Sequence, residues 1–399
     1  MPLYSFGSNG SGQLGIGHTD DVSIPSRCLF SSSSDSEGKL VQVAAGGNHT
    51  LLLFESGAAF SAGANEMGQC GGEQSTPAAP VGGLSSSLHF CFNRVVISDQ
   101  NEANRPLMEE GEGRNNSNND NEKTLIARFS FISATWEASF FVDLTRKNIY
   151  VIGAGTKAEL GLGPTVTYAP EPVRLVGFPP PDTEIVGISS SMGHTVVVLS
   201  NGLAYGWGGA RKGQLGAKEI PNKLCWFPVV IDIGHLPIPD PPPIRRVACG
   251  REFTVLVVGA NEDGAHSIRV IGSDKWNILS DARQNIQKCS TLSTSWHGAY
   301  IHTHTGEVLA WGRNDRGQLP PVDLPRLTHL ATGSEHVVGA IESRELVAFG
   351  WGEHGNCGPE TDSQGNVQGR WNKITLNLEG TPQITAVGAG CATSWLMTA

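Results

Sequence analysis

The sequence predicts an all-β fold, a seven-bladed β-propeller that closes into a ring. Three observations support this prediction. A hairpin-forming segment recurs along the chain, a fixed internal spacing marks seven copies of it, and the two chain ends supply complementary halves of one copy. A repeated unit that cannot bury its apolar face alone is typical of propellers and solenoids. We expect a single propeller over residues 1–399.

The composition is that of a turn-rich globular protein. The 399 residues include 50 glycines and 23 prolines, and 39% are apolar, so we expect a sizeable core and no long helices. No apolar run approaches the roughly 18 residues that cross a bilayer. The first residues also lack the basic and apolar regions of a secretory signal. We therefore expect a soluble, intracellular protein without a membrane partner.

The cysteines and the charge argue against two further classes of site. The eight cysteines are scattered, without a Cys-x-x-Cys pair or histidines at zinc-finger spacing. We therefore expect packed, reduced thiols, Cys357 and Cys391 among them, and no metal site. The net charge of −10 argues against direct binding of nucleic acid, because a phosphate backbone attracts cations. A local basic patch is still compatible with that charge.

The repeat becomes visible when the segment 44–70 is moved along the chain. Similar segments occupy 133–161, 189–216, 248–280, 293–320 and 331–358. Each contains an apolar run, a turn and a second run, as in VVVL (196–199), SNG (200–202) and LAY (203–205). Asn-Gly between two such runs is a strong signal for a β-hairpin. Each copy is therefore predicted to contribute at least two antiparallel strands.

A constant spacing identifies the copies. Six positions separate the glycine that ends the second strand from the residue in the position usually held by glutamine. The seven pairs are Gly7 and Gln13, Gly63 and Gln69, Gly153 and Glu159, Gly208 and Gln214, Gly272 and Ile278, Gly312 and Gln318, and Gly350 and Asn356. Seven copies predict seven blades.

The two chain ends predict that the ring is closed. Residues 388–399 form a first strand without a second, whereas residues 3–7 form a second strand without a first. Joining them gives a hairpin close in length to the complete copies. Pairing of the two ends would leave no open sheet edge. A linear solenoid is the alternative, but its terminal units would be caps rather than complementary halves.

Two insertions separate neighbouring blades. The segment 98–123 has almost no apolar residues and many asparagines and glutamates, so we expect a disordered surface loop between blades. A tethering or phosphorylation segment is its functional alternative. The second insertion, 223–246, is apolar and rich in proline and carries Trp226. This insertion either packs against the edge of a blade or forms a loop that docks a partner, and the sequence leaves both alternatives open.

No catalytic, cofactor or metal site is predicted. His49, His194 and His336 share one repeat position in three blades, so we expect each to form hydrogen bonds within its own blade rather than to share a metal ion. The Gly-x-Gly stretches precede turns and strands, so they do not form a dinucleotide cradle. No Ser-His-Asp or Cys-His arrangement follows from the spacing, and we do not expect an enzyme.

The two positions before the histidine are the candidate partner-binding residues. Repeat symmetry would place them around one face of the propeller near its axis. The first position holds Gly47, Trp136, Met192, Arg251, Trp296, Ser334 and Cys391, and the second holds Asn48, Glu137, Gly193, Glu252, His297, Glu335 and Ala392. Tryptophan and arginine supply contact area and carboxylates supply discrimination. We predict partner binding by Trp136, Glu137, Met192, Arg251, Glu252, Trp296, His297 and Glu335. The alternative is that the two tryptophans only cap blade cores.

The motifs Gly-x-x-His-Thr and Gly-Gln-Leu-Gly resemble the regulator-of-chromosome-condensation repeat family over the whole chain apart from the polar insertion. The segments LATGSEHVV (330–338), AFGWGEHGNCGPE (348–360) and GCATSWLM (390–397) further resemble the fungal alpha-tubulin-suppressor, or killer-toxin-insensitivity, propellers. This resemblance implies a non-enzymatic propeller in a heterodimer with a small CSL-type zinc-ribbon protein. It also implies roles in diphthamide biosynthesis and in Elongator-dependent modification of the tRNA wobble uridine, in the cytoplasm, with the nucleus as a second location.

A guanine-nucleotide exchange factor for a small GTPase is the alternative function, since the founding type of the family has that activity. Such an activity would call for an inserted wedge and, in the chromatin-bound type, for a basic tail. The longest insertion is polar and acidic, and the first residues already read as a strand. We therefore favour the protein-binding function.

Overall fold

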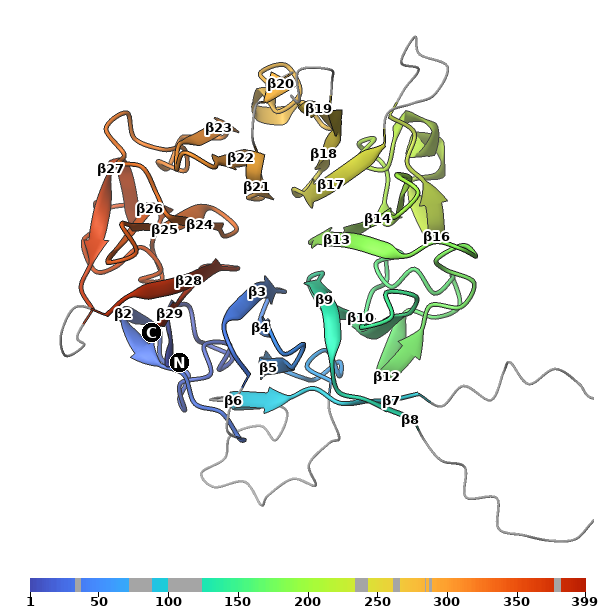
Figure 1. Ribbon diagram of the computed structural model, residues 1–399, viewed down its shortest axis with the longest axis horizontal. Coiled ribbons are helices and arrows are strands. Elements are labelled where there is room, and N and C mark those ends of the chain that lie inside the picture. The colour runs from blue at the N-terminus through green and yellow to red at the C-terminus, as the bar shows by residue number, and fades with distance from the viewer. Residues whose placement is uncertain are drawn as a thin grey trace, which may run out of the picture.

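Seven antiparallel sheets stand around a central axis, as the repeat predicts (Figure 1). The computed structural model describes residues 1–32, 37–71, 88–99, 124–233, 243–260, 266–283, 285–286, 289–376 and 382–399. We number the blades I to VII, beginning with the sheet that contains both chain ends. Apart from Ser98 and Asp99, the segment 98–123 that was predicted to be disordered lies outside the described residues.

Within the described ranges, six blades have four strands and blade VI has three. From the axis outward, the strands are β28 (Ile384–Ala389), β29 (Thr393–Thr398), β1 (Leu3–Gly7) and β2 (Val22–Arg27) in blade I, and β3 (Leu40–Ala45), β4 (His49–Phe54), β5 (Ala59–Ala64) and β6 (Leu88–Arg94) in blade II. In the same order they are β9 (Phe129–Ala134), β10 (Ala138–Asp143), β11 (Ile149–Ala154) and β12 (Tyr168–Arg174) in blade III, and β13 (Ile185–Ser191), β14 (His194–Leu199), β15 (Ala204–Gly209) and β16 (Leu224–Val230) in blade IV. They are β17 (Ile244–Cys249), β18 (Phe253–Ala260), β19 (His266–Gly272) and β20 (Asn285–Ile286) in blade V, β21 (Cys289–Thr294), β22 (Gly298–Thr303) and β23 (Val308–Gly312) in blade VI, and β24 (His329–Thr332), β25 (His336–Ile341), β26 (Glu345–Trp351) and β27 (Asn366–Ile374) in blade VII.

The remaining elements are small. Strands β7 (Ile97–Asp99) and β8 (Thr124–Ile126) pair with each other beside blades II and III. Two short 3-10 helices, η1 (Ala217–Asn222) and η2 (Lys275–Asn277), follow the third strands of blades IV and V. Neither helix of the described chain has the length or apolar character needed to cross a membrane.

The two chain ends share blade I, which confirms the predicted closure. Strand β1 pairs with β29 in antiparallel register, with Leu3 opposite Met397 and Gly7 opposite Thr393. The side chain of Trp395 is fully buried in the core cluster that also contains Leu3. Closure therefore rests on both strand pairing and apolar burial, and it covers edges that an open array would expose.

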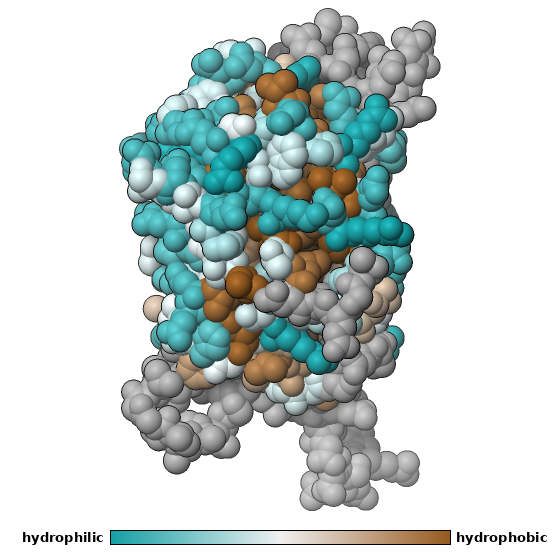
Figure 2. Space-filling view, turned by 90° about the vertical axis from the view of Figure 1, so that its left-hand side faces the viewer, coloured by the Kyte–Doolittle hydropathy of each residue, from teal (hydrophilic) through white to brown (hydrophobic). Residues whose placement is uncertain are grey.

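The core lies mainly between neighbouring blades. The second strands β4, β10 and β14 are buried along their whole length, and one apolar cluster joins Phe140 and Val151 of blade III to Val197 and Trp207 of blade IV. Burial of apolar area on both blade faces stabilises the ring. The side of the disc where β27 and β2 are outermost is covered largely by hydrophilic residues, with apolar patches between them (Figure 2).

The fixed spacing between the repeat glycine and glutamine has a local cause. Gly63 has a φ angle of 107°, and a Cβ atom there would lie 2.4 Å from the carbonyl oxygen of Asn48. Glycine is the residue that tolerates both conditions. The Oε1 atom of Gln69 then accepts a hydrogen bond from the backbone N–H of Met67 at 2.9 Å. Gln214 makes the same contact in blade IV. The spacing therefore defines one compact turn.

The three repeat histidines join neighbouring blades, so the prediction that they form hydrogen bonds within their own blades is wrong. Each Nε2 atom lies within hydrogen-bond distance of a hydroxyl in the next blade. The pairs are His49 with Ser139 at 2.9 Å, His194 with Thr254 at 3.0 Å, and His336 with Ser394 at 2.9 Å. Each hydroxyl donates to the carbonyl oxygen in the glutamine position of the histidine's own blade, at 2.6, 2.7 and 2.9 Å. Since the hydroxyl hydrogen is used there, the imidazole donates from Nε2.

In blade VI a different residue donates the hydrogen bond to the carbonyl oxygen in the glutamine position. Gly298 occupies the histidine position, and Val337 occupies the position of the neighbouring hydroxyl in blade VII. The hydroxyl of Tyr300 donates to the carbonyl oxygen of Gln318 at 2.8 Å. A buried carbonyl without a partner costs free energy, and Tyr300 satisfies it from within the blade.

The buried histidines make stability depend on pH. Burial lowers the pKa of His49, His194 and His336 from 6.5 to about 4. Between these two pH values the unfolded chain binds more protons than the folded chain. The contribution of the buried neutral histidines to the free energy of unfolding is therefore fully present above pH 6.5 and is lost as the pH falls towards 4. Each such histidine lowers the free energy of unfolding by about 2 kcal/mol between pH 7.5 and pH 5.

We predict that His194→Gln weakens this pH dependence. The variant retains a hydrogen-bonding side chain but has no group that titrates, so its free energy of unfolding should fall by about 2 kcal/mol less than that of the wild type between pH 7.5 and pH 5. Urea denaturation at both pH values measures the difference. His304→Gln, at an exposed position, is the matched control. An equal loss in wild type and His194→Gln would contradict the prediction.

Candidate functional site

The predicted partner-binding positions form a ring at the mouth of the central channel. They lie in the turns between the first and second strands of the blades, and backbone hydrogen bonds connect neighbouring turns. The N–H groups of Gly47, Trp136, Arg251, Trp296 and Ser334 donate to the carbonyl oxygens of Trp136, Met192, Trp296, Ser334 and Gly390 at 2.9, 3.3, 3.0, 2.9 and 2.9 Å. Backbone hydrogen bonds therefore fix the turns at five of the seven junctions between blades.

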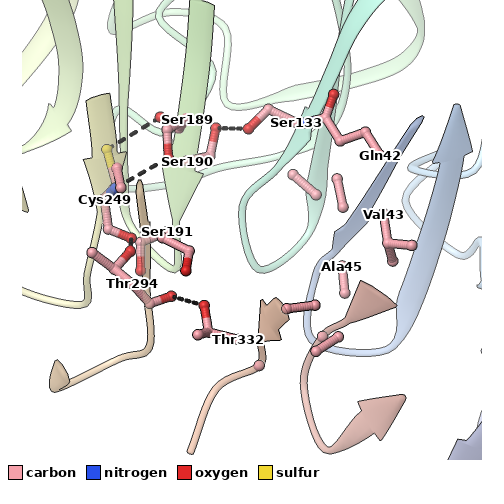
Figure 3. A pocket seen from close by; sticks show the side chains of 18 of the residues that line it. Gln42, Val43, Ala45, Ser133, Ser189, Ser190, Ser191, Cys249, Thr294 and Thr332 are labelled. Carbon is pink, nitrogen blue, oxygen red and sulfur yellow. Dashed lines mark hydrogen bonds between the residues drawn. The ribbon is translucent and has the colours of Figure 1, made fainter. Parts of the chain in front are cut away.

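The channel below this ring has a volume of about 470 Å³ and is lined by all seven inner strands. Many lining side chains are small and carry hydroxyls that join neighbouring blades (Figure 3). The Oγ of Ser133 donates to the Oγ of Ser190 at 2.7 Å, and Thr294 donates to the carbonyl oxygen of Cys249 at 2.8 Å. Burial raises the pKa of the Cys249 thiol to about 12, so this sulfur stays protonated. These groups stabilise the ring and do not form a nucleophile-and-base pair.

Two tryptophans from opposite sides of the ring meet over the channel mouth. The rings of Trp136 in blade III and Trp296 in blade VI have centroids 6.1 Å apart at an interplanar angle of 44°. The guanidinium carbon of Arg251 lies 5.9 Å from the centroid of the Trp296 ring, within the range of a cation–π interaction. Trp136 is still 39% exposed. We call Trp136, Trp296 and Arg251 the tryptophan cluster.

Gly47 gives Trp136 its position. A Cβ atom on Gly47 would lie 2.6 Å from the Trp136 ring, closer than van der Waals contact permits. The indole therefore lies directly against the turn of blade II. Any side chain at position 47 would move the ring away from it.

A pocket of about 700 Å³ adjoins the cluster above blades III, IV and V. Five of the eight predicted residues line it, namely Trp136, Glu137, Met192, Arg251 and Glu252. It is also lined by four cationic residues that lie outside the two repeat positions before the histidine, namely Lys157, Arg211, Lys212 and Lys223. The first three lie in the loops that follow the third strand, and Lys223 directly precedes β16. Those loops share a face with the ring, since Gly209 N–H donates to the carbonyl oxygen of Gly193 at 2.7 Å. The sequence signal for these four residues is their position in the loops after the third strands, which lie on the same face as the ring of turns.

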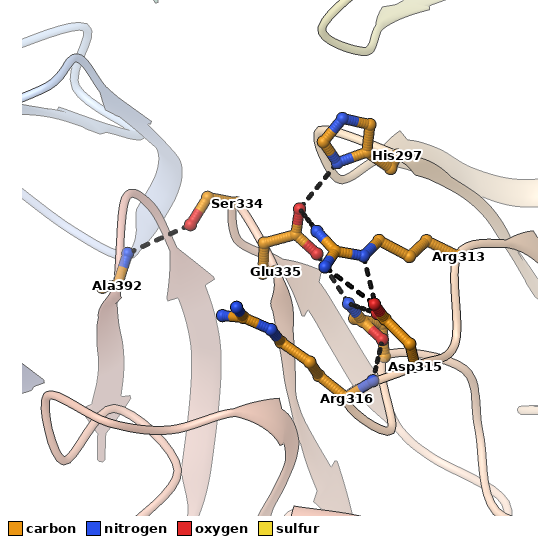
Figure 4. A network of polar contacts seen from close by, with 8 residues as sticks. His297, Arg313, Asp315, Arg316, Ser334, Glu335 and Ala392 are labelled. Atoms are coloured by element: carbon orange, nitrogen blue, oxygen red, sulfur yellow. Dashed lines mark hydrogen bonds and ion pairs between the residues drawn. The ribbon is translucent and has the colours of Figure 1, made fainter. Parts of the chain in front are cut away.

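Glu335 and His297 lie apart from this pocket in a network that joins blades VI and VII (Figure 4). The carboxylate of Glu335 accepts hydrogen bonds from His297 Nδ1 at 2.7 Å, Gln318 Nε2 at 2.7 Å and Arg313 Nη1 at 3.2 Å. Burial alone would raise the pKa of Glu335, but the hydrogen bonds from His297 and Gln318 and the neighbouring charges hold it below its ordinary value. With only 3% of its surface exposed, Glu335 supports the turn and is not an exposed contact.

The described residues contain no group of three or more His, Cys, Asp or Glu side chains that could hold a metal ion. The side chains of Cys28, Cys70, Cys225, Cys249 and Cys357 are buried, and Cys91 and Cys391 are partly buried. Burial raises the pKa of Cys391 to about 12 and that of Cys357 further. Both thiols are therefore protonated, and Cys357 is buried as the sequence predicts.

Comparison with known proteins gives the family. The RCC1-like domain model matches residues 2–396. An RCC1 repeat-containing protein of Schizosaccharomyces pombe is 29% identical over 99% of this chain and 98% of its own length. The secretion-regulating guanine nucleotide exchange factor of Mus musculus is 23% identical over 90% of this chain and 76% of its own length.

Two solved structures share the fold. Prp20p of Saccharomyces cerevisiae has a TM-score of 0.70 and 16% identity, covering 100% of this chain and 91% of its own. Human WBSCR16 has a TM-score of 0.69 and 16% identity, covering 100% of both chains. Because the family model extends over nearly the whole sequence and the seven blades agree with it, the chain belongs to the family of RCC1-like domain propellers.

Proposed function

We propose that this propeller is a non-enzymatic binding protein that holds a protein partner on the face of the tryptophan cluster. The observation that carries the proposal is the contact between Trp136 and Trp296 over the channel mouth, beside Arg251. Tryptophan and arginine are enriched among the residues that dominate binding energy, and such residues cluster near the centre of an interface. The backbone hydrogen bonds that Trp136, Arg251 and Trp296 make with neighbouring turns would hold these anchors with little further ordering cost.

The partner we propose is a small CSL-type zinc-ribbon protein, bound one to one. Support comes from the resemblance of 330–338, 348–360 and 390–397 to the killer-toxin-insensitivity propellers. These segments include the ring turns at Ser334 and Cys391 and so contribute to the same face. The proposed roles are in diphthamide biosynthesis and, through an indirect link to Elongator, in modification of the tRNA wobble uridine. The proposed location is the cytoplasm, with the nucleus as a second one.

We predict that Trp136→Ala and Trp296→Ala each weaken this complex by about 2 kcal/mol, or roughly 30-fold in Kd, because each removes a large anchor at the centre of the face. Isothermal titration calorimetry with the purified zinc-ribbon protein measures the loss. Trp371→Ala, on the outermost strand β27 of blade VII, is the control and should bind like the wild type. Full affinity of both cluster variants would remove this face from the interface, and no binding by the wild type would reject the partner.

Guanine-nucleotide exchange is the second candidate function. Its support is the name of the Mus musculus and Bos taurus relatives, which are 23% identical to this chain. If partner binding is the function, the purified chain should not accelerate release of a fluorescent GDP analogue from a panel of small GTPases. Acceleration with any member of the panel would favour exchange activity instead.

A further inference from the structure

The pocket above blades III, IV and V carries five exposed cationic side chains. Lys157, Arg211, Lys212, Lys223 and Arg251 line it and are all exposed. Within the described part of the chain, none of these five side chains forms an ion pair with a carboxylate; Arg251 makes only its contact with Trp296. The whole chain has a net charge of −10, so this concentration of unpaired cations runs against its overall charge.

The pocket has an open floor and one apolar wall. Gly193 lies in the turn between β13 and β14, and a Cβ atom placed there would meet no heavy atom within 4 Å. Trp136 and Met192 form the wall towards the axis. An extended segment could therefore lie across Gly193 with one apolar side chain against this wall.

The carboxylates of the pocket are separated from most of its cations. Glu137 and Glu252 belong to turns of the inner ring, whereas Lys157, Arg211 and Lys212 belong to the loops after the third strands. The third carboxylate, Glu159, accepts the backbone N–H of Lys157 in its own loop. The outer part of the pocket is therefore cationic and the inner part offers hydrogen-bond acceptors.

We propose that this pocket binds an acidic peptide segment of a protein partner, with an apolar side chain of that segment against Trp136 and Met192. This inference deepens the proposed function, because it assigns a chemistry to what the same face binds. A peptide fits better than a nucleic acid. Its carboxylates can pair with the outer cations while its backbone N–H groups donate to Glu137 and Glu252. A continuous phosphate backbone would meet those two carboxylates with like charge.

The first test uses a fluorescein-labelled peptide of about twelve residues, rich in Glu and Asp with one central Leu, and fluorescence polarisation with the full chain. We expect saturable binding that weakens about tenfold or more when Gln and Asn replace the acidic residues, and that also weakens with added salt. Equal binding of the acidic and amide peptides would overturn the proposal, as would no binding of either.

Substitutions at two glycines that have free space around the Cβ position locate the peptide-binding site. Gly193→Trp fills the pocket, and we expect it to weaken peptide binding about tenfold or more. Gly10→Trp is the matched control, because Gly10 lies in the loop of blade I and also has no heavy atom within 4 Å of its Cβ position. The double variant Arg211→Glu with Lys212→Glu should act like Gly193→Trp without filling the pocket. Unchanged peptide binding in the double variant, or equal effects of the two glycine variants, would overturn the proposal.

Two further measurements distinguish peptide binding in this pocket from nucleic-acid binding and from the proposed zinc-ribbon partner. A single-stranded oligonucleotide that binds more tightly than the acidic peptide, and is lost in Gly193→Trp, would reassign the pocket to nucleic acid and reject the peptide. Titration of the same variants with the zinc-ribbon protein distinguishes the two proposals. If that protein does not bind while the peptide results are as expected, the pocket assignment stands and the proposed partner fails.

Discussion

The antiparallel pairing of β1 with β29 is the interaction on which the rest of the structure depends. Every other blade is built from consecutive strands, whereas blade I takes its two inner strands from one end of the chain and its two outer strands from the other. If these strands separated, blades I and II would lose the core cluster that buries Leu3 and Trp395. The channel, the ring of turns and the pocket would then have no fixed geometry, because each is assembled from several blades.

The candidate surface is a product of this closure. Trp136 and Trp296 belong to blades III and VI, and they come into contact only because the ring sets the distance across its mouth. Beneath them, hydroxyl groups of the channel wall form inter-blade contacts such as that of Ser133 with Ser190. The face therefore combines a stiff frame with side chains that remain accessible, which is a favourable combination for recognition because little order is lost on binding.

The sequence predicts the architecture better than the site. The spacing from Gly63 to Gln69 reflects one turn geometry, so it can be counted without coordinates. The histidine contacts were predicted wrongly, because a periodic pattern does not show whether His49 faces its own blade or the next. The carboxylate of Glu335 contacts His297 and Arg313 of the neighbouring blade, and the cations of the pocket lie in loops whose residues vary among the copies. The spacing of the repeat describes the turns within one blade. It does not indicate which residues of different blades lie together, and both the histidine contacts and the pocket depend on that.

The bridges between blades create two different kinds of junction. His336 needs the hydroxyl of Ser394 in the blade that follows it, whereas Tyr300 serves a junction where Val337 offers no hydroxyl. If blade II took the place of blade VI, His49 would face Val337, which has no hydroxyl to accept its hydrogen bond. The seven repeats are thus alike in fold yet not freely interchangeable, and such an exchange would have to alter residues in both blades of a junction.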